Sequence, residues 1–331
     1  MSLTMLTAAD QARLLRAAQA GDQPAFETLV VAAHQRALHV HCYRMLGSLD
    51  DADEATQETL LLAWRGLAGY QQRAPLRHWL YRIATTTCLK FQASRGRQPV
   101  SVAELTYLSP YPDRLLDELA ATDDDPAAHA ERRESVRLAF IVALQLLPAT
   151  QRAVLILREV LVWSAAEVAE LLDTSVAAVN SLLQRARATV RATEAGSAIA
   201  GGSGRLDRRD REVVDRFVAA WQRVDVDALA ALLREDAVLR MPPERAEYVG
   251  RVPVAHFFAT VPAGGRLDQI ELTVTSANGQ PCLAAYLTGD GMTRPYGVMV
   301  LTVAGGEIAA ITGFPDPALF GRFGLSRSDS G

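Results

Sequence analysis

Residues 50–91 bring together two kinds of side chain that suit different partners. Residues 50–59 read Asp-Asp-Ala-Asp-Glu-Ala-Thr-Gln-Glu-Thr, and residues 76–84 read Leu-Arg-His-Trp-Leu-Tyr-Arg-Ile-Ala. An acidic helix face is complementary to a basic protein surface. Aromatic rings beside arginines suit unstacked bases and phosphates. One compact unit with both surfaces indicates a protein that brings a large enzyme to nucleic acid.

The first 193 residues are predicted to fold into two helical regions. Within 51–67, apolar or small residues recur with helical spacing. The opposite face of that helix carries Glu54, Gln57, Glu58, Leu61 and Arg65. In the second region, 133–193, the sequence Ser164-Ala-Ala-Glu167 is a capping box, and a short turn at 173–175 precedes a last helix rich in arginine. Two short helices joined in this way predict a helix-turn-helix.

The remaining segments read as linkers and a third domain. Prolines and the acidic run Asp123–Asp125 punctuate residues 93–132, which indicates an extended linker with short helical turns around 115–121. Residues 196–204 are rich in glycine and predict a flexible linker. Beyond 207, two helical patterns are followed by alternating strand patterns, with a hairpin turn at Gly305-Gly306. This part is predicted to be a separate α+β domain.

The totals exclude several classes of protein. The chain has 331 residues, 49% of them hydrophobic, and a net charge of −4, which argues weakly against DNA binding by bulk charge alone. No run of about 18 apolar residues exists, so no membrane partner is expected. The three cysteines are far apart in sequence, and neither a disulfide framework nor a metal site is predicted. We therefore expect a cytoplasmic protein.

The chain resembles a bacterial extracytoplasmic-function sigma factor with a C-terminal SnoaL-like domain. The sigma resemblance lies in residues 41–48, 53–59, 76–84, 147–158 and 163–191, and the SnoaL-like resemblance in 237–243, 248–250 and 314–325. The fold that this implies is two all-α sigma domains, the second a helix-turn-helix, followed by an α+β SnoaL-like cone-shaped barrel domain. The implied boundaries are sigma region 2 at 8–95, an acidic linker at 96–132, sigma region 4 at 133–193, a Gly-rich linker at 194–206 and a SnoaL-like regulatory domain at 207–326.

The resemblance implies core RNA polymerase as a partner, through the β′ clamp and the β flap. The residues that it assigns to core-polymerase binding are Asp53, Glu54, Gln57, Glu58 and Leu61. The alternative for this acidic helix is a solvated surface. The acidic linker at 113–131 has two readings as well, one as a solvated segment and one as a mimic of nucleic acid in the basic channel of the polymerase.

Promoter DNA is the second implied partner. The residues assigned to the downstream (−10) element are Arg73, Arg77, Trp79, Tyr81, Arg82 and Lys90, and those assigned to the upstream (−35) element are Ser175, Ala178, Asn180, Ser181, Gln184, Arg185 and Arg187. A large aromatic in a helical stripe is often a core residue, so Trp79 has a structural role as its alternative.

The C-terminal domain is expected to regulate rather than to catalyse. SnoaL-like folds enclose an apolar pocket, and the polar residues that we select for a candidate ligand pocket are Tyr248, His256 and Asp290. They form no recognisable acid–base pair, so no cofactor and no enzyme activity are expected, although a small-molecule ligand remains a candidate partner. Two alternatives stay open. One is a SnoaL-like enzyme fused to a DNA-binding module, and the other is a helix-turn-helix regulator that does not bind polymerase.

Overall fold

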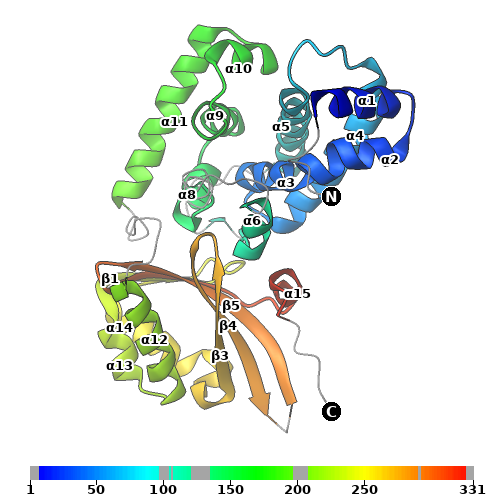
Figure 1. Ribbon diagram of the computed structural model, residues 1–331. Coiled ribbons are helices and arrows are strands. Elements are labelled where there is room, and N and C mark those ends of the chain that lie inside the picture. The colour runs from blue at the N-terminus through cyan, green and yellow to red at the C-terminus, as the bar shows by residue number, and fades with distance from the viewer. Residues whose placement is uncertain are drawn as a thin grey trace. The chain divides into compact units, whose positions relative to one another are not determined.

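The computed structural model describes residues 7–96, 104–105, 107–120, 135–196, 208–289 and 292–325 (Figure 1). The chain divides into two compact units. The first unit comprises the described residues within 1–99, 117–129 and 144–190, and the second unit comprises those within 100–116, 130–143 and 191–331. Each unit therefore gathers segments that are distant in sequence.

The N-terminal part of the first unit is a bundle of helices. Its elements are α1 (Ala8–Gln19), α2 (Gln23–Phe26), the π-helical turn η2 (Glu27–Val31), α3 (Ala32–Leu46), α4 (Leu49–Gly66), η3 (Leu67–Gly69) and α5 (Leu76–Arg95). Helices α3, α4 and α5 pack against one another. The stripe predicted for α4 is confirmed, because Ala52, Ala55, Thr59 and Ala63 are buried while Glu54 and Gln57 are exposed.

The C-terminal part of the first unit contains the helix-turn-helix. Helix α8 (Leu138–Gln145) contains the point of division between the two units, and α9 (Ala149–Leu155), η5 (Ile156–Val160), α10 (Ala165–Leu171) and α11 (Val176–Gly196) follow it. The predicted capping box is present: Ser164 N donates to Glu167 Oε2 at 2.7 Å, and Glu167 N donates to Ser164 Oγ at 3.2 Å. The Ser175 hydroxyl caps α11 by accepting from Ala178 N at 3.1 Å.

The second unit is built on a six-stranded sheet. Its strands are β1 (Leu233–Arg240), β2 (Glu247–Val249), β3 (Ile270–Ala277), β4 (Gln280–Gly289), β5 (Met292–Ala304) and β6 (Glu307–Phe314), in the spatial order β2-β1-β6-β5-β4-β3. Strands β1 and β6 are parallel, and the other neighbours are antiparallel. Among the described strands, β2 and β3 form the two edges.

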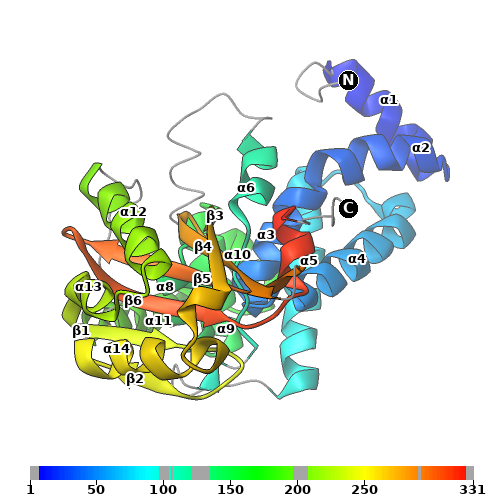
Figure 2. The same cartoon turned by 90° about the horizontal axis from the view of Figure 1, so that it is seen from below.

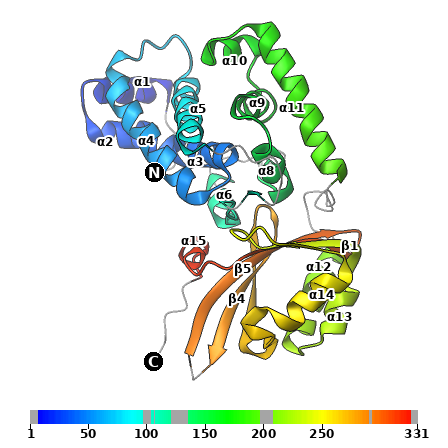
Figure 3. The ribbon, with the colours of Figure 1, turned by 180° about the vertical axis from the view of Figure 1, so that it is seen from behind.

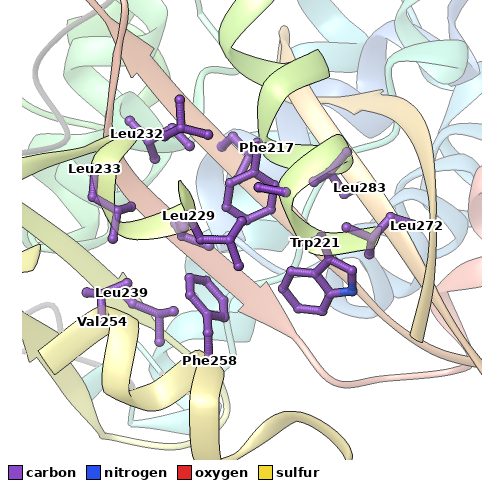
Figure 4. Packing of buried hydrophobic residues seen from close by; sticks show 14 of the residues in the cluster. Phe217, Trp221, Leu229, Leu232, Leu233, Leu239, Val254, Phe258, Leu272 and Leu283 are labelled. Atoms are coloured by element: carbon purple, nitrogen blue, oxygen red, sulfur yellow. The ribbon is translucent and has the colours of Figure 1, made fainter. Parts of the chain in front are cut away.

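Three helices cover one face of this sheet. Figures 1, 2 and 3 agree that α12 (Arg208–Gln222), α13 (Val226–Ala231) and α14 (Arg251–Thr260) lie on that face. The rings of Phe217, Trp221 and Phe258 meet in the core between the helices and the sheet (Figure 4), with Trp221 and Phe258 edge to face at 5.5 Å. The Trp221 indole N–H donates to Ile270 O at 3.1 Å, so its polar atom is satisfied.

Strand β4 is also buried on its other face. Cys282, Ala284 and Tyr286 alternate with the core residues of the strand, yet each is at most 2% exposed. The Tyr286 ring packs against Phe320 of α15 (Leu319–Phe323) at 4.9 Å, and its hydroxyl donates to Leu325 O at 3.0 Å. Burial raises the pKa of the Cys282 thiol, which keeps this side chain in its neutral form.

The turn between β3 and β4, residues 277–280, lies inside the second unit instead of at its surface. We call it the Asn278 turn. Asn278 and Gly279 both have positive φ, as a tight hairpin of this kind requires. Asn278 is fully buried and joins two other segments, because its Oδ1 accepts from Tyr111 N at 2.7 Å and its Nδ2 donates to Val136 O at 2.6 Å.

Neighbouring residues of the Asn278 turn extend this contact. The backbone Asn278 N donates to Tyr111 O at 2.8 Å, Gly279 N donates to Asp113 Oδ1 at 2.8 Å, and Leu138 N donates to Gln280 Oε1 at 3.2 Å. Residues 107–116, which the sequence analysis assigns to a linker, are thus packed in the second unit. Helix α6 (Asp113–Ala120) begins within them.

Replacing Asn278 by alanine is expected to loosen both segments that the turn holds. Two buried backbone groups, Tyr111 N–H and Val136 C=O, lose these partners, and a hydrogen bond lost in this way costs about 1–3 kcal/mol. Hydrogen exchange of residues 107–116 and 135–143 should accelerate by at least tenfold. Val274→Ala, on the exposed side of the same hairpin, is the matched control. Equal exchange in the two variants would contradict the role given to Asn278.

Candidate functional site

The predicted polymerase-binding residues form one acidic face on α4. Glu54, Gln57 and Leu61 are exposed, Leu61 to 49%, while Asp53 and Glu58 are half-buried. They are spaced so that they share one side of the helix. An apolar side chain surrounded by acids and an amide is a surface that a basic protein partner with an apolar centre would fit.

Neighbouring helices hold the acids of this face in place. Arg95, at the end of α5, pairs with Asp51 and with Glu54, the latter at 2.7 Å. From α3, His39 Nε2 lies 2.9 Å from Asp53 Oδ1. The structure therefore organises the acidic face through α3 and α5, which the sequence pattern did not reveal.

The predicted −10 residues divide into an exposed set and a buried one. Arg73, Arg77, Arg82 and Lys90 are exposed, and Trp79 is half-buried with its ring 5.1 Å from that of Tyr70. Both aromatic rings lie at the loop between η3 and α5. Tyr70, Arg73, Trp79 and Arg82 line one cavity and so bring two rings and two cations together, as nucleic-acid binding would require.

Tyr81 is buried away from that surface, which argues against its predicted contact with DNA. It is 7% exposed, and its ring meets the ring of His41 edge to face at 5.1 Å. Tyr81 falls on the buried stripe of α5 with Ala84, Thr85 and Cys88. Thr85 Oγ1 lies 2.9 Å from His41 Nε2, and burial lowers the pKa of His41 to about 3. This contact is therefore made by a neutral histidine, and it fixes α5 on α3.

A cavity of about 320 Å³ lies in the first unit, next to the exposed residues of α5. Tyr70, Arg73, Trp79 and Arg82 line one side of it, and Trp163, Glu167, Glu170 and Leu171 line the other. The cavity therefore combines flat rings with both signs of charge.

The predicted −35 residues lie on α11. Ser175, Asn180, Ser181, Gln184, Arg185 and Arg187 are exposed, and Ala178 is half-buried. Val179, Leu183, Ala186 and Val190 hold the opposite face of the helix in the core. Arg185 Nη1 donates to Ser181 Oγ at 3.0 Å, and Arg187 pairs with Glu159 of η5. The helix thus presents one polar face, as a recognition helix requires.

A buried arginine joins the helix-turn-helix part to the N-terminal bundle. Arg152 of α9 is 2% exposed, and its guanidinium donates to Met45 O, Gln145 Oε1, Gln145 O and Leu147 O. Met45 lies at the end of α3, where helix carbonyls carry partial negative charge. The buried positive charge is thus matched by carbonyl dipoles.

Gln145 completes the same contact. Its Nε2 donates to Arg44 O at 3.1 Å, and its side chain fills the space above Gly47, where an added Cβ would lie 2.8 Å from Gln145 Cδ. Gly47 ends α3 with φ +72°, so this position needs glycine for its conformation and for its contact. The only sign of Arg152 in the sequence is a cation directly before the apolar run 153–157, which does not reveal its role.

The cavity of the second unit differs from the predicted ligand pocket. It measures about 60 Å³ and is lined by apolar groups, chiefly Trp221, Phe257, Phe258, Met299 and Phe314. Tyr248 is not among its lining residues and packs on the outside of Phe257, with ring centres 5.0 Å apart. His256 is exposed on α14, and Asp290 lies outside the described residues. Among the lining residues no carboxylate or imidazole is present to act as acid or base.

The described part of the chain contains neither a metal-binding cluster nor a membrane-spanning helix. Within it, no group of three or more His, Cys, Asp or Glu side chains could hold a metal ion. None of the helices in these ranges is long and apolar enough to cross a membrane.

Comparison with known proteins agrees with this arrangement. The chain matches the family models for sigma-70 region 2 over residues 30–98, sigma-70 region 4 over 137–190 and the SnoaL-like domain over 214–311. The ECF RNA polymerase sigma factor SigG of Mycobacterium tuberculosis (strain H37Rv) is 38% identical over an aligned length of 320, and the alignment covers 89% of this chain and 82% of SigG. The chain belongs to the ECF sigma factor family.

Two further relatives show how the parts of this sigma factor relate to others. SigM of M. tuberculosis (strain H37Rv) is 30% identical over 177 residues, 54% of this chain and 81% of SigM. The crystal structure of the M. tuberculosis ECF sigma factor SigJ shares the fold, with a TM-score of 0.60 and 24% identity over 88% of this chain and 98% of that one. As an ECF sigma factor, the protein is a transcription factor that binds RNA polymerase and promoter DNA.

Replacing Arg152 by methionine is expected to destabilise the first unit. The substitution keeps much of the apolar stem but removes four hydrogen bonds to oxygen acceptors, of which Met45 O still accepts from Gln92, and it should lower the free energy of unfolding by about 2–4 kcal/mol. Urea unfolding of the full chain measures this loss. Arg185→Met removes an exposed arginine of the same region and should change stability by no more than about 0.5 kcal/mol. Equal urea midpoints for the two variants would contradict the stabilising role given to Arg152.

Proposed function

We propose that this sigma factor uses three parts of the first unit in promoter-specific initiation: the acidic face of α4, the loop at 70–75 with α5, and the helix-turn-helix part. The acidic face of α4 docks on the β′ clamp of core RNA polymerase, and the helix-turn-helix part contacts the β flap. The loop at 70–75 and α5 capture the −10 element, and α11 enters the major groove at the −35 element. These events place the protein in the cytoplasm.

The observation that carries the proposal is the exposed Leu61 within the acidic face. An apolar side chain that is 49% exposed beside Glu54 and Gln57 is only partly packed, and the core of a protein interface would bury the rest of it. The surrounding acids would steer a basic partner and fix its orientation.

Different residues are proposed to hold the DNA backbone and to contact the bases. Arg77, Arg82 and Lys90 would neutralise the backbone of an open strand, and Trp79 with Tyr70 would offer stacking surfaces for unpaired bases. On α11, Asn180, Ser181 and Gln184 are the side chains for base edges, and Arg185 and Arg187 are placed for phosphates. Tyr81 is left out of this set because of its burial.

The second unit is proposed to modulate the first. The Asn278 turn holds residues on both sides of the segment that connects the N-terminal bundle to the helix-turn-helix, namely Tyr111 and Asp113 before it and Val136 and Leu138 after it. Any state in which these two chain segments part must give up those hydrogen bonds. A small apolar ligand in the cavity beside Trp221 would act only if it bound the two states unequally.

Leu61→Glu is expected to weaken binding to core RNA polymerase by about tenfold or more, because it places a charge at the centre of the proposed interface. Titration of labelled protein with core polymerase measures the affinity. Glu27→Arg alters an exposed charge elsewhere on the same bundle and should leave the affinity within about twofold. Unchanged affinity of Leu61→Glu would exclude this face as the docking surface.

Removal of the chain after Ala195 and the single change Asn278→Ala are expected to shift promoter-specific transcription in the same direction by severalfold, because both release the connecting segments. Run-off transcription with core polymerase, on promoters selected by genomic binding, measures the shift. Val274→Ala should transcribe like the parent protein. Equal transcription from the full chain and from both altered forms would rule out modulation by the second unit.

A further inference from the structure

Helix α10 lies against the very residues of α5 that the proposed function assigns to the −10 element. His78 Nδ1 is 3.3 Å from Glu167 Oε1, and Arg82 Nη1 is 3.1 Å from Glu170 Oε1. The two α5 residues are four apart and the two α10 residues three apart, so each pair lies on one helix face. All four belong to the first unit.

A ring contact completes this surface. The His78 ring stacks on Trp163, which immediately precedes the helix cap Ser164, with centres 4.5 Å apart and planes 20° apart. Trp163 is 5% exposed and is held by its backbone, since its N donates to Leu157 O at 2.9 Å and its O accepts from Arg158. The α10 segment therefore offers α5 two carboxylates and one flat ring in a fixed arrangement.

These are the groups that a single DNA strand would offer to the same residues. A phosphate brings negative oxygens to arginine, and a base brings a flat ring to an aromatic or imidazole face. Hydrogen bonds from Ser164 lower the pKa of Glu167, so this carboxylate stays charged. We propose that α10 and Trp163 act as a built-in competitor that occupies the −10 reading surface of α5 until DNA or polymerase displaces them. The proposal rests on the function assigned to α5 above.

The contact between α10 and α5 is weak enough for DNA or polymerase to displace α10. Exposed side-chain fractions are 49% for Arg82 and 77% for Glu170, and 18% for His78 and 44% for Glu167. The exposed Arg82–Glu170 ion pair contributes little by itself and is screened by salt, and the His78–Glu167 contact is an ion pair only when the imidazole is protonated. Together they bias the first unit toward the masked state without locking it, and the high local concentration of phosphates on DNA can replace them.

The test is a double substitution, Glu167→Gln with Glu170→Gln. Glutamine keeps the size of each side chain, and at position 167 it can also serve in the capping box, so α10 should stay folded. The matched control is Glu159→Gln, which removes one exposed carboxylate of the same region whose partner is Arg187 and not α5. Fluorescent labels on Ala68→Cys and Ala188→Cys report the distance between the N-terminal bundle and the helix-turn-helix part. Both positions are exposed, whereas the native cysteines are buried and should not take the label.

We expect energy transfer between the labels to fall in the double variant and to stay at the parent value in Glu159→Gln. Added salt should lower it in the parent protein as well. Either Glu170→Arg or Arg82→Glu alone should lower it, and the two together should restore it, because the pair then reforms with exchanged charges. Transcription at limiting core polymerase should rise about two- to tenfold in the double variant, which is the range that one exposed ion pair and one further polar contact can supply.

Equal energy transfer in the double variant and in Glu159→Gln would overturn the masking contact. So would a fall in energy transfer without any rise in transcription, because the contact would then not limit access to α5. Absence of promoter-specific transcripts from every form, the parent included, would instead overturn the proposed function, and the energy-transfer measurements would still decide whether α10 contacts α5.

Discussion

The buried guanidinium of Arg152 is the constraint on which the interfaces of the first unit depend. A charge removed from water is stable only if nearby dipoles replace its hydration, and here four oxygen acceptors do so. One of them, Met45 O at the end of α3, also accepts from Gln92 of α5 at 2.7 Å. A single carbonyl therefore ties together α3, α5 and α9. Because only two residues separate the end of α3 from the start of α4, the acidic face of α4 is positioned by the same contact.

Much of the fold was predictable because its signals are local. The spacing of small residues in 51–67 predicts which side of α4 is buried, and the capping box at Ser164 and Glu167 marks where α10 begins. The exposed face of α11 also follows from its periodicity, since Val179, Leu183 and Ala186 lie on one side. Such patterns depend on neighbours three or four residues away, which the sequence displays directly.

The errors and omissions concern side chains whose surroundings come from distant parts of the chain. Tyr81 resembles a DNA-stacking residue because arginines flank it, but α3 brings His41 against its ring. Tyr248 and His256 were selected as polar residues near an apolar pocket, yet the cavity is lined chiefly by rings and aliphatic groups from five strands and from α12 and α14. The Asn278-Gly279 pair is a strong hairpin signal that the sequence analysis overlooked. Even if recognised, it would not have revealed that the turn is buried by residues far earlier in the chain.

The hydrogen bonds of the Asn278 turn also set how the connecting segment responds to changes in its length. Because Asp113 and Val136 are both held by this turn, the chain between them is a closed loop, whatever its sequence. The entropy of closing a flexible loop grows only with the logarithm of its length, at about 0.6 kcal/mol for each doubling. Insertions and deletions in this segment should therefore be tolerated in evolution far more readily than any change at the two points where the loop is closed.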